Sequence, residues 1–305
     1  MTIKKNKILI FGAGVIGSAY AIKFIEAGFD VTLFARSNRF ITLKEKGLRY
    51  NEKGMIKSIN VNVIDTLENG DVYDFIFVTV RYEQAESALL ALVNNQSESI
   101  VTMINNSSGF SVWQEIIGDK LLPAFPGIGG QIKDDVLYAR FPPKALTSAM
   151  FGEIDGFTTK RVRNLAKLFD EANLPYKINT NMKDFLITHS ISDIALIGAL
   201  HLNHEIVNKK TLKSRKTAQG ITLTLKKYLR AIQKAGVSLD PSLYKILLKC
   251  PSFILDFFFM MWLRTDMVKD MLAPEFANNA TNEVSKLKMD LLKFLEENNV
   301  DLKEL

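Results

Sequence analysis

The histidines of this chain all fall within residues 181–205, as His189, His201 and His204. An imidazole can bind a metal or move a proton near neutral pH. His189 and Asp193 are four residues apart, which on a helix places them on one face. A carboxylate beside an imidazole favours the charged imidazolium and fixes its orientation. The pair therefore predicts a general acid, with a structural His–Asp pair or a core histidine as the alternative.

A shared metal site is a poorer explanation of these histidines. On a continuous helix, His189 and His201 would lie roughly 18 Å apart at the usual rise per residue. His201 and His204 are close enough to pair, but only Glu205 stands nearby as a third ligand. We therefore expect surface histidines at these positions and no bound metal.

A second motif with chemical potential is the glycine-rich hexapeptide GAGVIG. It directly follows the apolar run KILIF and opens a helical pattern, which is the context of a dinucleotide-binding loop. In such a loop the first glycine permits a tight turn, the second lets backbone N–H groups approach a pyrophosphate, and the third allows close helix–strand packing. A tight turn without ligand is the alternative. The residues expected to bind the cofactor phosphates are Gly12, Ala13, Gly14, Val15, Ile16 and Gly17.

The end of the next predicted strand indicates which nicotinamide cofactor is bound. NAD-binding proteins place Asp or Glu there to hold the ribose 2′-OH. This chain has Arg36 and Arg39, with no carboxylate until Glu45. Because guanidinium groups bind a 2′-phosphate and a carboxylate repels one, the sequence predicts NADPH. Two solvated surface arginines are the alternative.

The first half of the chain must position these residues, and its pattern alternates between strands and helices. Helical stretches separate the earlier strands, and a further amphipathic helix is expected over residues 158–174. This alternation predicts βαβ units and a mainly parallel, doubly wound sheet. The strands are expected at residues 7–11, 30–36, 73–81, 99–106, 121–128, 136–141, 148–154 and 176–180.

From Met182 onward the pattern is helical, and no strand pattern follows. The sequence therefore predicts an α/β Rossmann-type doubly wound domain, residues 1–180, followed by an all-helical C-terminal domain, residues 181–305. The helices of this second domain are expected at residues 182–204, 212–235, 242–250, 252–264 and 280–297.

Composition narrows the class of protein. A chain of 305 residues with 47% hydrophobic and 24% charged residues is typical of an ordinary globular protein that can form two cores. The formal charge is +6, but Lys and Arg are spread along the chain, which argues against nucleic-acid binding. The single Cys250 excludes an internal disulfide framework and fits a reducing compartment. We therefore expect a cytoplasmic protein.

The aromatic run FILDFFFMMWL, residues 253–263, is the segment most easily mistaken for a membrane signal. It contains Asp256 and is too short to span a bilayer of about 30 Å. Its aromatic residues occupy every face of a helix, which usually means a buried core helix. An apolar wall for a bulky substrate and a membrane-surface segment are the alternatives. No membrane partner is expected.

The layout of these motifs resembles the ketopantoate reductases, the NADPH-dependent enzymes that reduce 2-dehydropantoate to pantoate. The resemblance rests on the glycine loop, the arginine after the second strand, and three further segments. It implies an NADPH cofactor and a small 2-keto acid as substrate, and we expect a homodimer. The further segments are TVRYEQ (79–84), MINNSSG (103–109) and TNEVSKL (281–287).

The resemblance assigns roles to individual residues. Arg81 takes the place of a basic residue near the cofactor phosphates. Asn106 takes the place of an asparagine that touches both the nicotinamide side and the substrate. Gly130 lies where the family's chain passes close to the cofactor, and Glu283 takes the place of the ribose-binding carboxylate.

The first helix of the second domain departs from the family pattern. The family has Lys-x-x-x-Asn-x-x-x-Asn there, with the lysine as proton donor, whereas alignment places His189, Asp193 and Ile197 at these positions. A family serine falls around Asp270 or Met271. We therefore expect an altered substrate pocket, in which His189 paired with Asp193 is the candidate acid. Asn106 is the expected hydrogen-bond donor to the substrate carbonyl.

The leading functional hypothesis is an NADPH-dependent reductase of a small 2-keto acid, either 2-dehydropantoate or a related ketone, acting by hydride transfer. A non-catalytic NADPH or metabolite sensor on the same fold is the alternative, because such a protein would also lack the family's lysine and asparagines. An enzyme that makes or uses an amino-acid derivative is a third option. In the reductase we expect a cleft between the domains, lined by Asn106, His189, Asp193 and Glu283.

Overall fold

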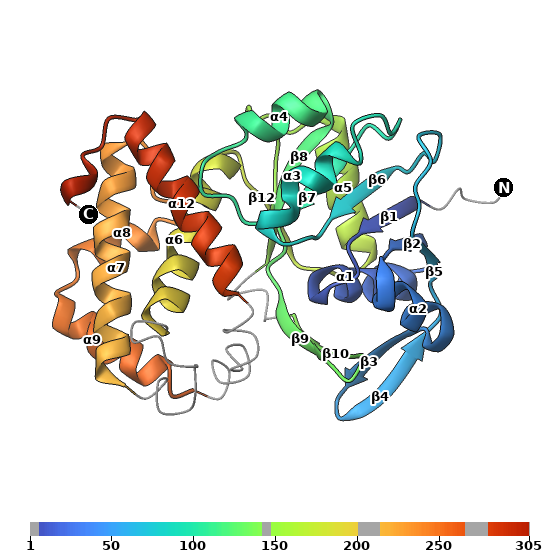
Figure 1. Cartoon of the computed structure of the whole chain (residues 1–305), viewed down its shortest axis with the longest axis horizontal. Coiled ribbons are helices and arrows are strands. Elements are labelled where there is room, and N and C mark those ends of the chain that lie inside the picture. The colour runs from blue at the N-terminus through green and yellow to red at the C-terminus, as the bar shows by residue number, and fades with distance from the viewer. Residues whose placement is uncertain (1–5, 142–147, 201–213, 266–279, 305) are drawn as a thin grey trace. The chain divides into compact units, whose positions relative to one another are not determined.

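The computed structural model describes residues 6–141, 148–200, 214–265 and 280–304, and the chain forms two compact units (Figure 1). The first comprises Met1–Ile104 and Phe110–Met182, and the second Asn105–Gly109 and Lys183–Leu305. The first unit is α/β and the second is helical, so the predicted fold class is confirmed. The short segment 105–109 belongs with the helical unit although it interrupts the first half of the sequence.

An eight-stranded sheet forms the centre of the α/β unit, in the order β12-β11-β8-β7-β6-β1-β2-β5. All neighbouring strands are parallel except β11, which runs antiparallel to β8. The mainly parallel sheet expected from the alternating pattern is therefore present. Its strands are β1 (Lys7–Phe11), β2 (Asp30–Phe34), β5 (Asn62–Ile64), β6 (Phe75–Val78), β7 (Ile100–Met103), β8 (Leu121–Phe125), β11 (Ala149–Phe151) and β12 (Tyr176–Ile178).

Helices cover this sheet, and β6 and β7 are buried at every position and apolar except at Thr102. The ring of Phe77, in β6, contacts two helices: Phe24 of α1 (Val15–Glu26) at a centroid distance of 5.2 Å, and Phe169 of α5 (Lys160–Glu171) at 6.5 Å. These aromatic contacts form part of the core of the unit. The helices are α1 (Val15–Glu26), α2 (Ser37–Lys46), η1 (Tyr82–Gln84), α3 (Ala85–Leu90), α4 (Ser111–Ile117), η2 (Gly118–Lys120) and α5 (Lys160–Glu171).

A second sheet of four strands, in the order β4-β3-β10-β9, was not predicted as such from the sequence (Figure 1). Its strands are β3 (Leu48–Glu52), β4 (Met55–Ile59), β9 (Gly129–Lys133) and β10 (Val136–Arg140). The expectation that only helical stretches lie between the second and third strands is wrong, because β3, β4 and β5 all fall there. The β3–β4 strands are short and mostly exposed or half-buried, so their hydrophobic pattern is weak.

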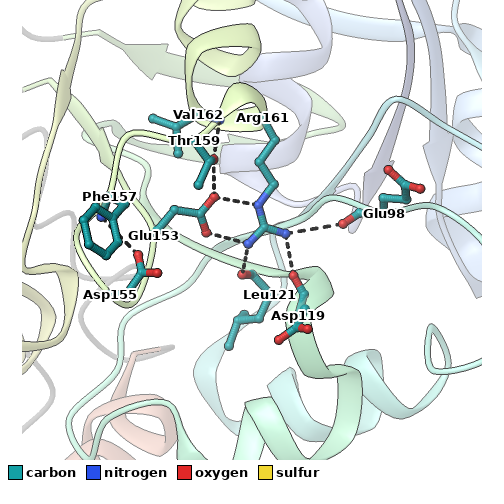
Figure 2. A network of polar contacts seen from close by, with 9 residues as sticks. All are labelled: Glu98, Asp119, Leu121, Glu153, Asp155, Phe157, Thr159, Arg161 and Val162. Carbon is teal, nitrogen blue, oxygen red and sulfur yellow. Dashed lines mark hydrogen bonds and ion pairs between the residues drawn. The ribbon is translucent and has the colours of Figure 1, made fainter.

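A buried ion pair joins α5 to the main sheet (Figure 2). Glu153 is only 6% exposed, and it accepts hydrogen bonds from Arg161 Nε at 2.7 Å and from the Thr159 hydroxyl at 2.5 Å. Arg161 also donates to the carbonyl oxygens of Asp119 at 2.5 Å and Leu121 at 3.1 Å. Leu121 begins β8, so this network lies at the amino edge of the parallel strands. Its charges are paired with one another and with backbone groups, which indicates a structural role.

The second unit contains helices and no strand within its described residues. The first helix, α6, is apolar on nearly all sides, and Leu186, Ile187 and Ile191 are fully buried. A helix of this kind belongs in the centre of a bundle. The helices of this unit are α6 (Met182–Leu200), α7 (Arg215–Lys234), α8 (Leu243–Lys249), α9 (Ser252–Trp262), α12 (Thr281–Glu297) and η4 (Leu302–Glu304).

Helix α9 contains most of the aromatic run, and the prediction of a fully buried helix is wrong. Leu255 and Phe259 are buried, and α9 packs against α7. The opposite face is open: Phe253 is 73% exposed and Phe257 62%. Hydrophobicity alone predicts burial but does not say which face finds a partner. No described helix is long and apolar enough to cross a membrane.

Candidate active site

The glycine loop connects β1 to α1 at the carboxyl edge of the main sheet. Phe11 ends β1 and Val15 begins α1, so the loop residues are Gly12, Ala13 and Gly14. Strand β1 lies between β2 and β6, and the chain builds the sheet outward on both sides of it. In open α/β sheets this switch point is where ligands bind.

Two of the three glycines are required by the fold itself. Gly12 has φ +123°, a conformation that residues with a side chain rarely adopt. A Cβ on Gly17 would lie 1.9 Å from the carbonyl oxygen of Gly12 and 2.5 Å from Thr79 Oγ1. Gly17 therefore allows α1 to pack closely on the loop and on the end of β6, as predicted for the third glycine of the motif.

Gly14 has no such requirement. Its φ of −76° and ψ of −163° are accessible to any residue, and a Cβ there would meet nothing within 4 Å. It stands at the N-terminus of α1, where no side chain accepts a hydrogen bond from the first turn. A helix N-terminus with uncapped N–H groups and open space attracts an anion. The residues present thus fit a dinucleotide pyrophosphate.

The two arginines after β2 differ in their surroundings. Arg39 Nε donates to the carbonyl oxygen of Ala13 at 3.1 Å, and its Nη2 donates to Ser18 Oγ at 3.3 Å. These hydrogen bonds stabilise the glycine loop. Burial lowers the pKa of the Arg39 guanidinium and the Asp135 carboxylate acts against that effect. Arg36 is exposed at the N-cap of α2, with its guanidinium 5.3 Å from the centre of the Phe34 ring.

Arg81 and Gly130 complete the predicted cofactor residues of the α/β unit, and Thr79 contacts the glycine loop. Thr79 follows β6 and its hydroxyl donates to the carbonyl oxygen of Gly12 at 2.8 Å. Arg81 is exposed at the N-cap of η1, two residues further on. A Cβ on Gly130 would lie 2.3 Å from the carbonyl oxygen of Tyr138, so the pairing of β9 with β10 is enough to require glycine there. Its cofactor contact stays a prediction.

In the helical unit, His189 and Asp193 face each other across one turn of α6. His189 Nε2 lies 3.9 Å from Asp193 Oδ2, within ion-pair range but too far for a direct hydrogen bond. The same Oδ2 accepts a hydrogen bond from Asn105 Nδ2 at 2.7 Å. Burial raises the pKa of the Asp193 carboxyl, while the charge of His189 and the Asn105 amide oppose that rise. The His189 ring stacks on Phe185 at 5.9 Å.

The neighbouring asparagines of MINNSSG have different tasks. Asn106 is 2% exposed and closes a turn: its Oδ1 accepts from the backbone N–H groups of Ser108 and Gly109, and its Nδ2 donates to the Gly109 carbonyl oxygen at 2.8 Å. Asn105 instead contacts Asp193, and its buried Oδ1 has no hydrogen-bond partner among the described residues. Sequence reasoning missed Asn105, because two adjacent identical residues cannot be told apart by type.

The loop that carries both asparagines is bonded to two helices of its unit. It reaches α6 through Asn105, and Ser107 Oγ donates to the carbonyl oxygen of Leu287 in α12 at 2.8 Å. Glu283 stands one turn before Leu287, half-buried in the first turn of α12. The residues predicted to line one cleft therefore all belong to the helical unit, namely Asn106, His189, Asp193 and Glu283.

Tyr244 adds a further group that the sequence did not single out. Its hydroxyl and that of Ser192, on α6, are 2.5 Å apart. Burial raises the pKa of Tyr244, the hydrogen bond with Ser192 opposes that rise, and the negative charge of Asp193 adds to it. Tyr244 therefore lies in the electrostatic environment of Asp193.

The remaining predicted positions are outside the described residues, namely His201, His204, Glu205, Asp270 and Met271. Within the described part of the chain, no group of three or more His, Cys, Asp or Glu side chains gathers in a way that could hold a metal ion.

Comparisons with known proteins agree with this architecture. None of the curated proteins matches the sequence. D-mandelate dehydrogenase, solved with NADH and anilino(oxo)acetate, is 16% identical with a TM-score of 0.66, covering 96% of this chain and 100% of its own. The 2-dehydropantoate 2-reductase from Geobacter metallireducens GS-15 is 15% identical with a TM-score of 0.64, covering 94% and 99%. That from Methylococcus capsulatus is 17% identical with a TM-score of 0.60, covering 97% and 99%.

At these identities the structural likeness shows the fold alone, and the family assignment comes from the sequence match. That match spans residues 8–124, which include the glycine loop, both arginines after β2 and the asparagine loop. The resemblance predicted from the sequence is thereby confirmed. Residues 8–124 match the model of the ketopantoate reductase PanE/ApbA family, and the fold of the chain is that of the solved 2-dehydropantoate 2-reductases.

Proposed function

We propose that this protein is a nicotinamide-dependent oxidoreductase that reduces a small 2-keto acid, 2-dehydropantoate or a related ketone, with NADPH as its preferred cofactor. The observation that carries the proposal is Gly14, a glycine that neither backbone conformation nor crowding explains. A phosphate seated at the N-terminus of α1 gives that glycine a reason. The family match over residues 8–124 supports the oxidoreductase class.

Residues of the α/β unit would hold the nucleotide. The uncapped first turn of α1, which follows Gly14, would bind the pyrophosphate, Arg81 would add positive charge near the phosphates, and Arg36 would bind the 2′-phosphate. Arg36 is exposed and stands where α2 begins, so the positive end of that helix adds to its charge. Gly130 is proposed to lie close to the cofactor. Glu283, in the helical unit, is proposed to bind the ribose hydroxyls. Bound NADPH supplies the hydride.

Residues of the helical unit would supply the proton and orient the keto acid. His189 in its charged form donates a proton to the carbonyl oxygen that becomes the alcohol, and Asp193 favours that charged form. We assign the substrate hydrogen bond to Asn105 and not to Asn106. The side chain of Asn106 is already hydrogen-bonded within its own turn. The buried Oδ1 of Asn105, which has no hydrogen-bond partner in the described part of the chain, would accept a hydrogen bond from the product hydroxyl.

Replacing Arg36 by alanine should weaken NADPH and leave NADH almost unchanged. A charge-assisted hydrogen bond to the 2′-phosphate contributes roughly 1.5–3 kcal/mol, which predicts at least about a tenfold rise in the Kd for NADPH. Fluorescence titration with both nucleotides measures the effect. Arg230→Ala, an exposed arginine of α7, is the control and should change neither affinity. Equal dissociation constants of the wild type for both nucleotides would contradict an NADPH preference.

A sensor that binds NADPH without turnover is the second candidate function. It is favoured by one observation, the departure from the family's catalytic pattern at His189, Asp193 and Ile197. An NADPH-oxidation screen of the purified protein against a panel of 2-keto acids separates the two candidates. Turnover that disappears in Gly14→Val supports the reductase, whereas tight NADPH binding without turnover on any member of the panel supports the sensor.

We also propose that the protein is a homodimer. The open face of α9 supports this, because a contiguous exposed apolar surface marks an interaction site. Light scattering gives the subunit number, and Phe257→Glu should shift it to a monomer. A wild-type mass of one chain would contradict the dimer. The apolar residues of the open face are Phe253, Ile254, Phe257, Phe258 and Met261.

A further inference from the structure

The carbonyl oxygen of Ala13, in the middle of the glycine loop, is held by two donors. Ser18 Oγ donates to it at 3.2 Å and Arg39 Nε donates to it at 3.1 Å. Because Arg39 Nη2 also donates to Ser18 Oγ at 3.3 Å, the three groups form a closed set of hydrogen bonds. Ser18 is fully buried in α1, and Arg39 reaches the loop from α2. Side chains of two different helices therefore fix one carbonyl group of the loop.

The direction of this carbonyl group determines the direction of the next N–H group. The peptide bond between Ala13 and Gly14 is trans. In a planar trans peptide, the C=O group and the N–H group point in opposite directions. The Ala13 oxygen points toward Ser18 and Arg39, so the Gly14 N–H group points away from them. No described residue accepts a hydrogen bond from this N–H group.

The space around Gly14 is open to a ligand. Gly14 is exposed, and a Cβ built on it would meet no atom within 4 Å. An N–H group that points into this space adds a donor to the uncapped N-terminus of α1, which attracts anions. If the peptide turned over, the Ala13 oxygen would take the place of that donor and repel a phosphate. The direction of this one peptide therefore decides whether the loop attracts or repels an anion at Gly14.

We propose that Arg39 and Ser18 are positioning residues for nucleotide binding, which hold the Ala13–Gly14 peptide with its N–H group toward the pyrophosphate. The inference rests on the proposed function, because it concerns the same nucleotide site. It separates the roles of the two arginines that follow β2. Arg36 is proposed to contact the 2′-phosphate, which only NADPH carries, whereas Arg39 acts through the loop on the pyrophosphate, which NADPH and NADH share.

The test is Arg39→Met, which keeps a long side chain and removes its hydrogen-bond donors. We expect the Kd for NADPH and the Kd for NADH to rise together by about tenfold, the usual contribution of one hydrogen bond to a charged group. The ratio of the two constants should keep its wild-type value, whereas Arg36→Ala should change it. Lys44→Met makes the same substitution at an exposed lysine of α2 and should change neither constant.

Two further variants distinguish positioning of the loop from a general loss of stability. Arg39→Lys keeps a charged donor on a long side chain and should recover part of the lost affinity for both nucleotides. Ser18→Ala should raise both constants by the same factor. That factor should be smaller than in Arg39→Met, because Arg39 Nε can still hold the Ala13 oxygen.

The outcomes separate the inference from the function on which it rests. If the wild-type protein binds neither nucleotide, the proposed function fails and the inference with it. If folded Arg39→Met loses affinity for NADPH alone, Arg39 contacts the 2′-phosphate and only the inference is overturned. Wild-type affinity for both nucleotides in folded Arg39→Met would also overturn it. Circular dichroism checks the fold, and Ser18→Ala provides the same test if Arg39→Met does not fold.

Discussion

Replacing Gly14 by valine is expected to abolish the binding of both NADPH and NADH, with at least about a 100-fold loss of affinity, or roughly 2.7 kcal/mol. The fold should survive, because the backbone angles of Gly14 suit any residue and its Cβ would meet no atom within 4 Å. The valine side chain would instead fill the space at the N-terminus of α1 that we assign to the pyrophosphate. Titration with each nucleotide measures the loss, and circular dichroism checks the fold.

Two other glycines make this experiment specific. Gly70 is exposed and a Cβ there also meets nothing within 4 Å, so Gly70→Val should fold and bind as the wild type does. Gly17→Ala should lower the stability by about 1–3 kcal/mol or more, because its Cβ would overlap the carbonyl oxygen of Gly12. A folded Gly14→Val protein with wild-type affinity would mean that the loop is only a turn, and the proposed function would lose its main support.

The glycine motif also shows how far sequence reasoning reaches. Its position after an apolar run and before a helical pattern was enough to predict the loop, and α1 begins where the motif requires. The different physical reasons for Gly12, Gly14 and Gly17 depend on atoms from elsewhere in the chain, such as Thr79 Oγ1. Local sequence therefore predicted the element, and only the packed structure showed which glycine is left for a ligand.

The pairing of strands that lie far apart in the chain could not be predicted from the sequence. The four-stranded sheet joins β3 and β4 to a hairpin far along the chain, and its strands are too short and too polar to stand out by periodicity. Lys46 and Asp135, which form an ion pair, come together only through that pairing. The choice between Asn105 and Asn106 was equally beyond local reasoning, because it depends on which side chain turns toward α6.

Replacing His189 by alanine is expected to lower kcat by roughly 10²–10⁴, the usual contribution of general acid catalysis. The Kd for NADPH should change little, because the proposed role of His189 is proton donation. His189→Gln is the matched variant, since it keeps a polar side chain that cannot hold the transferable proton, and it should be as impaired as His189→Ala. His189→Lys, which restores the family residue, should retain more activity than either and keep it to higher pH.

The pH profile tests the same assignment through Asp193. Burial raises the pKa of the Asp193 carboxyl, so this group carries its negative charge above that raised pKa and loses the charge as the pH falls through it. Where Asp193 is charged it favours the imidazolium of His189, 3.9 Å away. The charge on Asp193 should therefore raise kcat above that raised pKa, and Asp193→Asn should lower kcat there. The two profiles should meet at acid pH, where Asp193 is neutral. A flat profile, or full activity in His189→Gln, would show that another group or water delivers the proton.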